Sequence, residues 1–148
     1  MTDEPLQPVD RVSTGLTGLD EVLDDLRIGD NVVWRVTDLN DYRRFVLPFI
    51  DSAAASGRQI IYLRFGDHPP IVDSHPAVRT IAIDALGGFE SFTSRVWHLI
   101  EDHGRGAFYV CDSLSELLDA WATDAMVGNF FRVVCPFLFE LDTVAWFA

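Results

Sequence analysis

Apolar residues recur along this chain in two patterns, short continuous runs and longer stripes with helical spacing. Runs of β-branched and aromatic residues bounded by glycine, proline or aspartate predict buried strands. Five such strands are expected, at 31–36, 58–65, 79–84, 107–112 and 143–148. Apolar positions three and four residues apart predict amphipathic helices. Five helices are expected, near 18–26, from Asn40 to Gly57, from Gly87 to His103, from Ser113 to Ala125 and over 127–141.

The alternation of strands and helices predicts the fold class. Strands separated by helices form a parallel α/β sheet with helices on both faces, and nearly continuous apolar strands fit burial on both sides. Residues 1–12 are polar and contain Pro5 and Pro8, which predicts a flexible N-terminal arm. Residues 13–148 show no linker and are expected to form one domain.

The C-terminal part of the chain is unusually apolar. Seven large side chains crowd into 18 residues there: Phe130, Phe131, Phe137, Leu138, Phe139, Trp146 and Phe147. One helix and one edge strand are not expected to bury all of them, so a surface patch and self-association through residues 130–148 are predicted. Since a buried strand seldom forms a natural C-terminus, the domain is also expected to be truncated at that end.

Composition narrows the function classes. The chain has 148 residues, 49% of them hydrophobic, which excludes a disordered protein. It contains no lysine: its 11 basic residues are all arginine and face 23 acidic residues, for a net charge of −12. The missing lysine excludes a Schiff base, a pyridoxal anchor and the phosphate-binding lysine of a Walker A loop. The negative charge argues against nucleic acid and anionic membrane surfaces as partners.

The expected location is the cytoplasm. The acidic N-terminus has no apolar core, so it is not a signal peptide, and no apolar run is long enough to predict a membrane-spanning helix. Cys111 and Cys135 lie in apolar stretches and are predicted to be reduced, buried thiols.

Candidate chemistry is sought where ligands bind in open parallel sheets, outside the carboxyl ends of the strands. The loop 37–41 follows the first predicted strand, lacks glycine and carries two carboxylates, so it is unsuited to cradling a phosphate. Asp112 ends the fourth predicted strand and is followed by Ser113. A strand-end aspartate holds Mg²⁺ in Walker B motifs, but it also serves to cap the helix that follows, and the capping role is favoured here.

Other polar residues near the strand ends admit two interpretations. Asp67 with His68 is compatible with an acid/base pair or with a surface loop. Arg43 and Arg44, near a helix start, are compatible with anion binding or with a solvated helix face. The histidines show no metal-ligand spacing, and no metal site is predicted.

Several segments resemble RecA/KaiC-like ATPase domains. STGLTGLDEVL at 13–23 is similar to the segment that precedes the first core strand in that family, and FYVCDSL is similar to its Walker B strand. The resemblance covers roughly residues 13–148 and implies a RecA-like, mostly parallel sheet of about five strands with helices on both faces. It places Asp112 at the Mg²⁺-coordinating position and Asp67 where an acidic residue activates the attacking water.

One departure from that family is severe. VTDLNDYRRF stands where the family has Gly-x-x-Gly-x-Gly-Lys-Thr, so ATP binding does not carry over to residues 37–44. GLDEVL, DYRRFVLPF and VGNFFRVVCPFLFELDTVAWFA further resemble a subgroup at the N-termini of phosphoenolpyruvate synthase-like and pyruvate,phosphate dikinase-like proteins.

Three functional hypotheses follow. The first is a non-catalytic RecA/KaiC-like module for regulation or assembly, with no cofactor, in a larger phosphotransfer protein; its partners are other domains of that protein or further copies of itself. The second is a nucleotide-binding ATPase or kinase-type enzyme that uses ATP and Mg²⁺ in an altered site. That site is assigned to Asp112, Ser113, Asp67, Arg43 and Arg44. The third is a binding module for a small cation-bearing or neutral ligand at the acidic strand ends.

Overall fold

Five parallel strands form the central sheet of the computed structural model, which describes residues 11–121 and 123–148. The strands are β3 (Asn31–Val33), β4 (Ile60–Arg64), β5 (Val78–Ala82), β6 (Phe108–Asp112) and β7 (Val144–Phe147). Their spatial order is β3-β7-β6-β4-β5. Each lies within the range predicted from the sequence, except that β5 begins one residue earlier.

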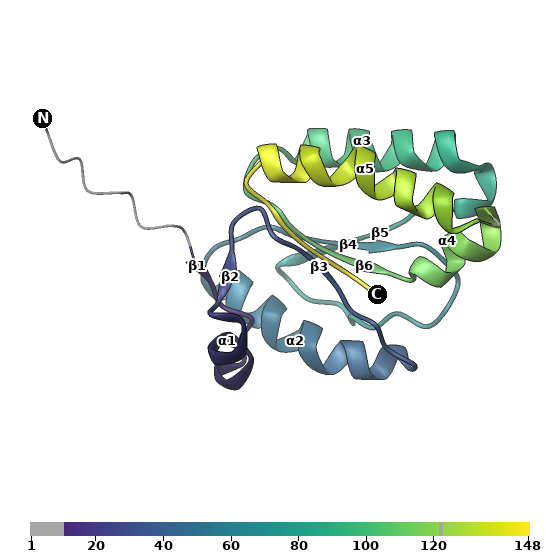
Figure 1. The fold of residues 1–148 in the computed structure, drawn as a ribbon. Helices are drawn as coiled ribbons and strands as arrows, with labels where there is room; N and C mark the ends of the chain where they lie inside the picture. Colours follow the sequence, from purple (N-terminus) through teal and green to yellow (C-terminus); the bar gives the residue numbers. More distant parts are fainter. Residues whose placement is uncertain (1–10, 122) are drawn as a thin grey trace, which may run out of the picture.

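Helices cover both faces of this sheet (Figure 1). Helix α2 (Leu39–Ala55) lies on one face, while α3 (Phe89–His103) and α5 (Asp124–Glu140) lie side by side on the other. Helix α4 (Leu114–Trp121) and a short 3-10 turn (Ala85–Gly87) pack at the end of the α3/α5 layer. The predicted fold class, α/β with a five-stranded parallel sheet between helices, is therefore confirmed.

Alternation along the strands explains why their sequences are apolar throughout. In β6, Tyr109 and Cys111 point into the core under α3 and α5, while Phe108 and Val110 point into the core over α2. Successive side chains of a strand face opposite sides of the sheet. Since both sides are covered, both sets of side chains must be apolar.

The N-terminal region differs from the prediction. The expected helix over 18–26 is α1 (Thr17–Leu23), because Asp24 and Asp25 adopt left-handed backbone conformations that end it. Leu26 is buried in a separate strand, β2 (Leu26–Arg27), which pairs antiparallel with β1 (Arg11–Val12). Residues 11 and 12 of the predicted arm are thus part of a strand, and residues 1–10 lie outside the described part of the chain.

Helix α2 begins one residue earlier than expected. Its N-cap is Asp38, whose side chain accepts a hydrogen bond of 2.8 Å from the backbone N–H of Asn40, so Asn40, the expected start, is the second residue of the helix. The helix continues through Pro48. Phe49 lies one residue further and stacks on Trp146 of β7, with ring centroids 4.1 Å apart and planes 8° apart.

The expectation that the C-terminal strand is an edge strand is wrong. β7 lies between β3 and β6 and pairs with both. Its side chains Trp146 and Phe147 are buried in the cores on the α2 face and the α3/α5 face of the sheet, respectively. Helix α5 buries Phe130 and Leu138 against the sheet, and Phe137 stacks on Trp97 of α3 at 3.9 Å. Of the seven side chains expected to form a patch, only Phe139, 65% exposed, is largely open to solvent.

Both cysteines are free, as predicted, but only one of them is fully buried. Cys111 is buried in β6, and Cys135 is half-buried in α5.

Gly15 offers a test of how the N-terminal segment is held. Its φ of +84° is a left-handed conformation, and a Cβ there would lie 2.1 Å from the carbonyl oxygen of Pro48. We expect Gly15→Ala to lower the free energy of unfolding by at least about 2 kcal/mol, measured by urea denaturation. The matched control is Gly18→Ala in α1, where a Cβ has no neighbour within 4 Å; that change should stabilise the protein by about 0.5–1 kcal/mol. Equal effects of the two substitutions would contradict this account.

Candidate functional site

The chain leaves β4 and β6 in opposite directions, although these strands are neighbours in the sheet. After β4, residues 65–77 run toward the α2 face, where Ile71 and Val72 are buried. After β6, the chain enters α4, which packs on the opposite face. Crevices in parallel sheets open where neighbouring connections diverge in this way. The carboxyl ends of β4 and β6 are therefore where a site is to be sought.

Asp112, the last residue of β6, lies at this divergence with 0% of its surface exposed. The hydroxyl of Tyr62 in β4 donates a hydrogen bond of 2.7 Å to its Oδ2. The Nε2 of His68, from the segment after β4, lies 3.1 Å from its Oδ1. The Tyr62 hydroxyl also accepts a bond of 3.2 Å from the backbone N–H of Ile71. One buried carboxylate thus connects two strands and the connection that follows β4.

Burial dominates the electrostatics of this cluster. Removal from water raises the pKa of Asp112, while the hydrogen bond from Tyr62 and the charge of His68 act in the opposite direction. Burial likewise raises the pKa of the Tyr62 phenol, with a further contribution from the charge of Asp112. The carboxylate has no open side from which a ligand can approach, so this arrangement suits a structural role.

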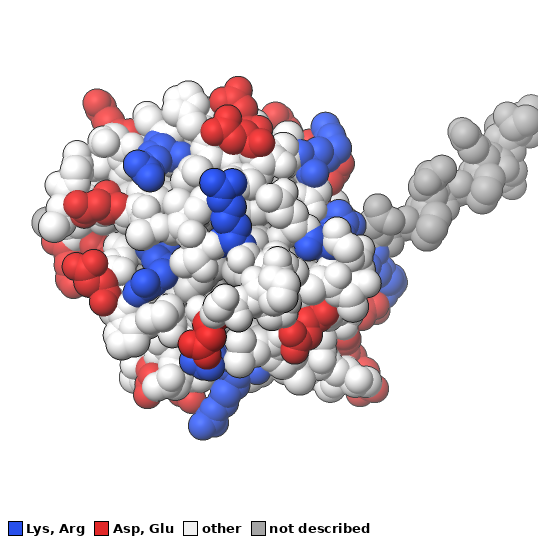
Figure 2. Space-filling view, turned by 180° about the vertical axis from the view of Figure 1, so that it is seen from behind, with Lys and Arg blue, Asp and Glu red and all other residues white. Residues whose placement is uncertain are grey.

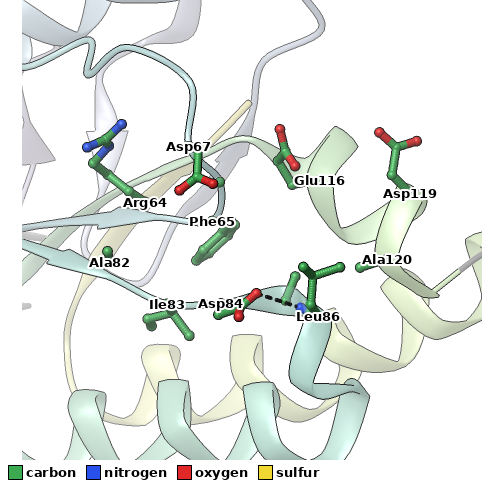
Figure 3. Close-up of a pocket in the computed structure, with 12 residues that line it drawn as sticks. Arg64, Phe65, Asp67, Ala82, Ile83, Asp84, Leu86, Glu116, Asp119 and Ala120 are labelled. Atoms are coloured by element: carbon green, nitrogen blue, oxygen red, sulfur yellow. Dashed lines mark hydrogen bonds between the residues drawn. The ribbon is translucent and has the colours of Figure 1, made fainter.

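Beside this cluster lies an open cleft of about 410 Å³ at the carboxyl ends of β4 and β5 (Figure 3). Phe65, Ile83 and Ala85 are buried apolar residues of its lining. Five charged residues also line the cleft: Arg64, Asp67, Asp84, Glu116 and Asp119.

The cleft has an excess of negative charge. Asp67, Glu116 and Asp119 lie along one side of it, and Asp84 on the other side accepts a hydrogen bond of 2.8 Å from the backbone N–H of Leu86 (Figure 3). None of these four carboxylates forms an ion pair with another residue in the described part of the chain. The cleft can therefore attract a cation and repels phosphate.

A second groove, also of about 410 Å³, borders the segment after β3. Ser113 lines it, together with Thr37 and the start of α4. The N-terminus of α2, next to this groove, already holds a carboxylate, since Asp38 bonds to its first turn. A helix N-terminus attracts anions through its free N–H groups and its dipole. Here that position is taken by the protein's own side chain.

The candidate residues from the sequence do not meet in one place. Asp112 is buried, Asp67 is exposed in the acidic cleft, and Ser113 lies in the second groove. Arg43 forms an ion pair of 2.8 Å with Asp73, and Arg44 is exposed on α2.

Two features of the region were missed at the sequence level. In the sequence, Tyr62 is one residue of an apolar strand, and no role was predicted for it. It lies two residues before the end of β4, whose last residue pairs with Asp112 of the neighbouring strand β6, so its hydroxyl can reach that carboxylate. Glu116 and Asp119 are three residues apart on α4, and this helical spacing was the available signal that both lie on one face.

Other kinds of site receive no support from the geometry. Among residues 11–121 and 123–148, no group of three or more histidine, cysteine or acidic side chains is arranged to hold a metal ion. None of the described helices has the length and hydropathy needed to cross a membrane. On the face drawn in Figure 2, arginine side chains lie interspersed with carboxylates rather than in one basic area.

The chain matches no protein-family model, and a search of curated proteins found no relative.

Removal of single hydroxyls tests the structural role of the buried cluster. Tyr62→Phe leaves Asp112 Oδ2 and the Ile71 N–H without their partner, so the free energy of unfolding should fall by about 2–4 kcal/mol in urea denaturation. The control is Tyr109→Phe in β6, whose equally buried hydroxyl has no hydrogen-bond partner in the described part of the chain. That variant should stay within about 1 kcal/mol of the wild type. Equal losses would show that Tyr62 acts through packing alone.

Proposed function

We propose that this domain is a non-catalytic RecA/KaiC-like module that acts in regulation or assembly and no longer binds ATP. The observation that carries this proposal is the state of Asp112. Its carboxylate is fully buried, with Tyr62 on one oxygen and His68 beside the other. A carboxylate that coordinates Mg²⁺ needs an oxygen open to the ion and its waters. Asp112 offers none.

The segment after β3 supports the same conclusion. Phosphate binding at a helix N-terminus needs free backbone N–H groups, usually presented by glycines, and a lysine that neutralises the charge. Residues 34–38 contain neither glycine nor lysine, and Asp38 occupies the N-terminus of α2. Each charge-assisted contact to a phosphate is worth about 1.5–3 kcal/mol, so the loss of several lowers affinity from micromolar to beyond millimolar.

The resemblance of several segments to the N-termini of phosphoenolpyruvate synthase-like proteins supports a place for this module in a larger phosphotransfer protein. In that setting its partners are neighbouring domains or further copies of the module. The alternative is an ATPase or kinase-type enzyme that uses ATP and Mg²⁺ around Asp112 and Asp67. These two residues have different surroundings, since one is buried and the other lies in the open cleft, which favours the non-catalytic module.

Calorimetry distinguishes these two functions. Titration of the wild-type protein with Mg·ATP should give no saturable heat up to about 1 mM nucleotide, because the contacts that hold β- and γ-phosphates are missing. Addition of MgCl₂ alone should leave the melting temperature unchanged in the wild type and in Asp112→Asn. A micromolar dissociation constant, or a magnesium-dependent rise in melting temperature that Asp112→Asn abolishes, would support the enzyme instead.

One observation favours a second candidate, the binding of a small ligand that carries a cation. The acidic cleft has four carboxylates and a buried apolar lining. The four carboxylates have no ion-pair partner among the described residues. Such a lining suits an amine or guanidinium on an aliphatic stem, since the stem contacts Phe65 and Ile83 while the charge stays near the carboxylates. A regulatory module needs a signal to sense, and this cleft is a place suited to receive one.

Binding of 1,5-diaminopentane tests this candidate. In a titration followed by NMR, the backbone amide of Gly66 should shift with a millimolar constant, because this glycine lies against the side chain of Glu116. Glu116→Gln should weaken binding about fivefold by removing one charge of the cleft, while Glu90→Gln, on the exposed first turn of α3, should not. An identical response to uncharged 1-pentanol, or none at Gly66, would exclude a cation site.

A further inference from the structure

The central sheet has two edge strands, β3 and β5, and they differ in their side chains. The open side of an edge strand carries backbone N–H and C=O groups that can pair with another chain, and charged side chains usually hinder such pairing. β5 carries a charge in its second position, where Arg79 is exposed. β3 consists of Asn31, Val32 and Val33 and carries no charge. β3 is therefore the less protected of the two edges.

The backbone of β3 presents hydrogen-bonding groups on the side away from β7. Just outside the strand, Asp30 accepts a hydrogen bond of 3.1 Å from β7, and Trp34 donates one of 2.7 Å to it. Because successive residues of a strand alternate in direction, the N–H and C=O groups of Asn31, Val33 and Arg35 face outward. Within the described part of the chain, β3 pairs only with β7, so these outward groups have no strand partner.

Apolar side chains border the same edge. Val32 packs in the core on the α2 face, so Val33 lies on the face that carries α4 and α5, where it is 59% exposed. At the amino end of β3, the exposed Phe139 of α5 lies over Gly29, since a Cβ on that glycine would be 2.7 Å from its ring. At the carboxyl end, the exposed Leu118 of α4 borders the same groove as Val33. Three of the seven large apolar side chains exposed in the described residues therefore border β3.

We propose that two copies of this chain associate through β3, with the two strands antiparallel and Val33 on the two-fold axis. In this register the outward groups of both strands meet, and Asn31 of each copy lies opposite Arg35 of the other. The two five-stranded sheets then continue into one. The choice of a second copy as partner rests on the assembly role proposed above.

The two-fold axis brings unlike ends of the edge together. Phe139 at the amino end of one β3 comes to lie beside Leu118 at the carboxyl end of the other. Strands in a sheet are about 4.8 Å apart, so α5, which packs on β7, lies about 14 Å from α5 of the second copy. Packed helices are only about 8–10 Å apart, which leaves a gap between the two α5 helices. The large side chains that are exposed in one copy can fill this gap.

Charge also favours a second copy as the occupant. Arg35 is exposed and forms no ion pair among the described residues. The antiparallel register places it beside the carboxyl end of α5 in the other copy, a helix whose last turn has no basic residue and ends at Glu140. A helix C-terminus attracts a cation through its free carbonyl groups and its dipole. Each copy therefore supplies the positive charge that α5 of the other lacks.

Sedimentation equilibrium of the full chain at physiological salt tests the interface. The wild type should have twice the mass of one chain at about 200 µM and should dissociate on dilution. Val33→Glu places two like charges opposite each other on the axis and should raise the dissociation constant at least about tenfold. The control is Val133→Glu, also at an exposed valine, one turn before Phe137, which stacks on α3. That variant faces away from β3 and should leave the constant within about twofold of the wild type.

A cross-link tests the register independently of any effect on stability. Opposed residues of a hydrogen-bonded antiparallel pair have Cα atoms about 5.5 Å apart, which a disulfide can span. Val33→Cys should therefore give a covalent dimer under mild oxidation, while Val133→Cys and the wild type should not. A wild type that stays monomeric, equal effects of the two glutamate substitutions, or no selective cross-link at Val33 would overturn the proposal.

The titration with Mg·ATP separates this interface from the function proposed above. A monomer that does not bind Mg·ATP would overturn the interface and leave the non-catalytic module in place. A dimer that binds Mg·ATP with a micromolar constant would keep the interface and overturn the non-catalytic module.

Discussion

The burial of one carboxylate constrains the whole carboxyl edge of this sheet. A charge with 0% exposure is tolerated only where neighbours compensate it, and Asp112 draws its compensation from a tyrosine on β4 and a histidine beyond it. Because these partners come from separate segments, they align β4 with β6 and hold the following connection against the α2 face. The same contacts close Asp112 to solvent, so what stabilises this edge also removes the aspartate from any chemistry with an external ligand.

The acidic composition has different consequences at different places. At the N-terminus of α2, the Asp38 carboxylate accepts a hydrogen bond from a backbone N–H of the first turn, and its negative charge repels a phosphate. At the ends of β4 and β5, carboxylates with no ion-pair partner among the described residues surround an apolar lining and leave a field that favours cations. Arginine is the only strong base in the chain, and four of the 11 arginines form ion pairs with aspartates in the described part, among them Arg43 with Asp73 and Arg105 with Asp142. The arginines therefore do not gather into a surface for polyanions on the face drawn in Figure 2.

Much of the fold was predictable because its signals are local. Glycines and apolar runs mark β4, β6 and β7 to within a few residues, and the stripe on α2 identifies the face that meets Phe108 and Trp146. The predicted elements were wrong where contacts between distant segments outweighed the local pattern of apolar residues. The leucines after Thr17 suggested one helix, but Leu26 is buried in a strand that pairs with β1, and two left-handed aspartates end α1 before it. The apolar C-terminal segment suggested an exposed patch, but β7 has neighbours on both sides.

The sequence by itself determined the α/β class, the positions of the strands, the absence of lysine chemistry and the lack of a glycine-rich phosphate loop. These properties depend on periodicity and composition, which can be read without knowing which segments meet. Tertiary structure alone decided the strand order, the interior position of β7 and the meeting of Tyr62, His68 and Asp112. The hydrogen bond between Tyr62 and Asp112 joins residues 50 positions apart, and no local pattern encodes such a contact. Whether a strand-end aspartate is open to a ligand or sealed by its neighbours therefore depends on packing, and here packing sealed it.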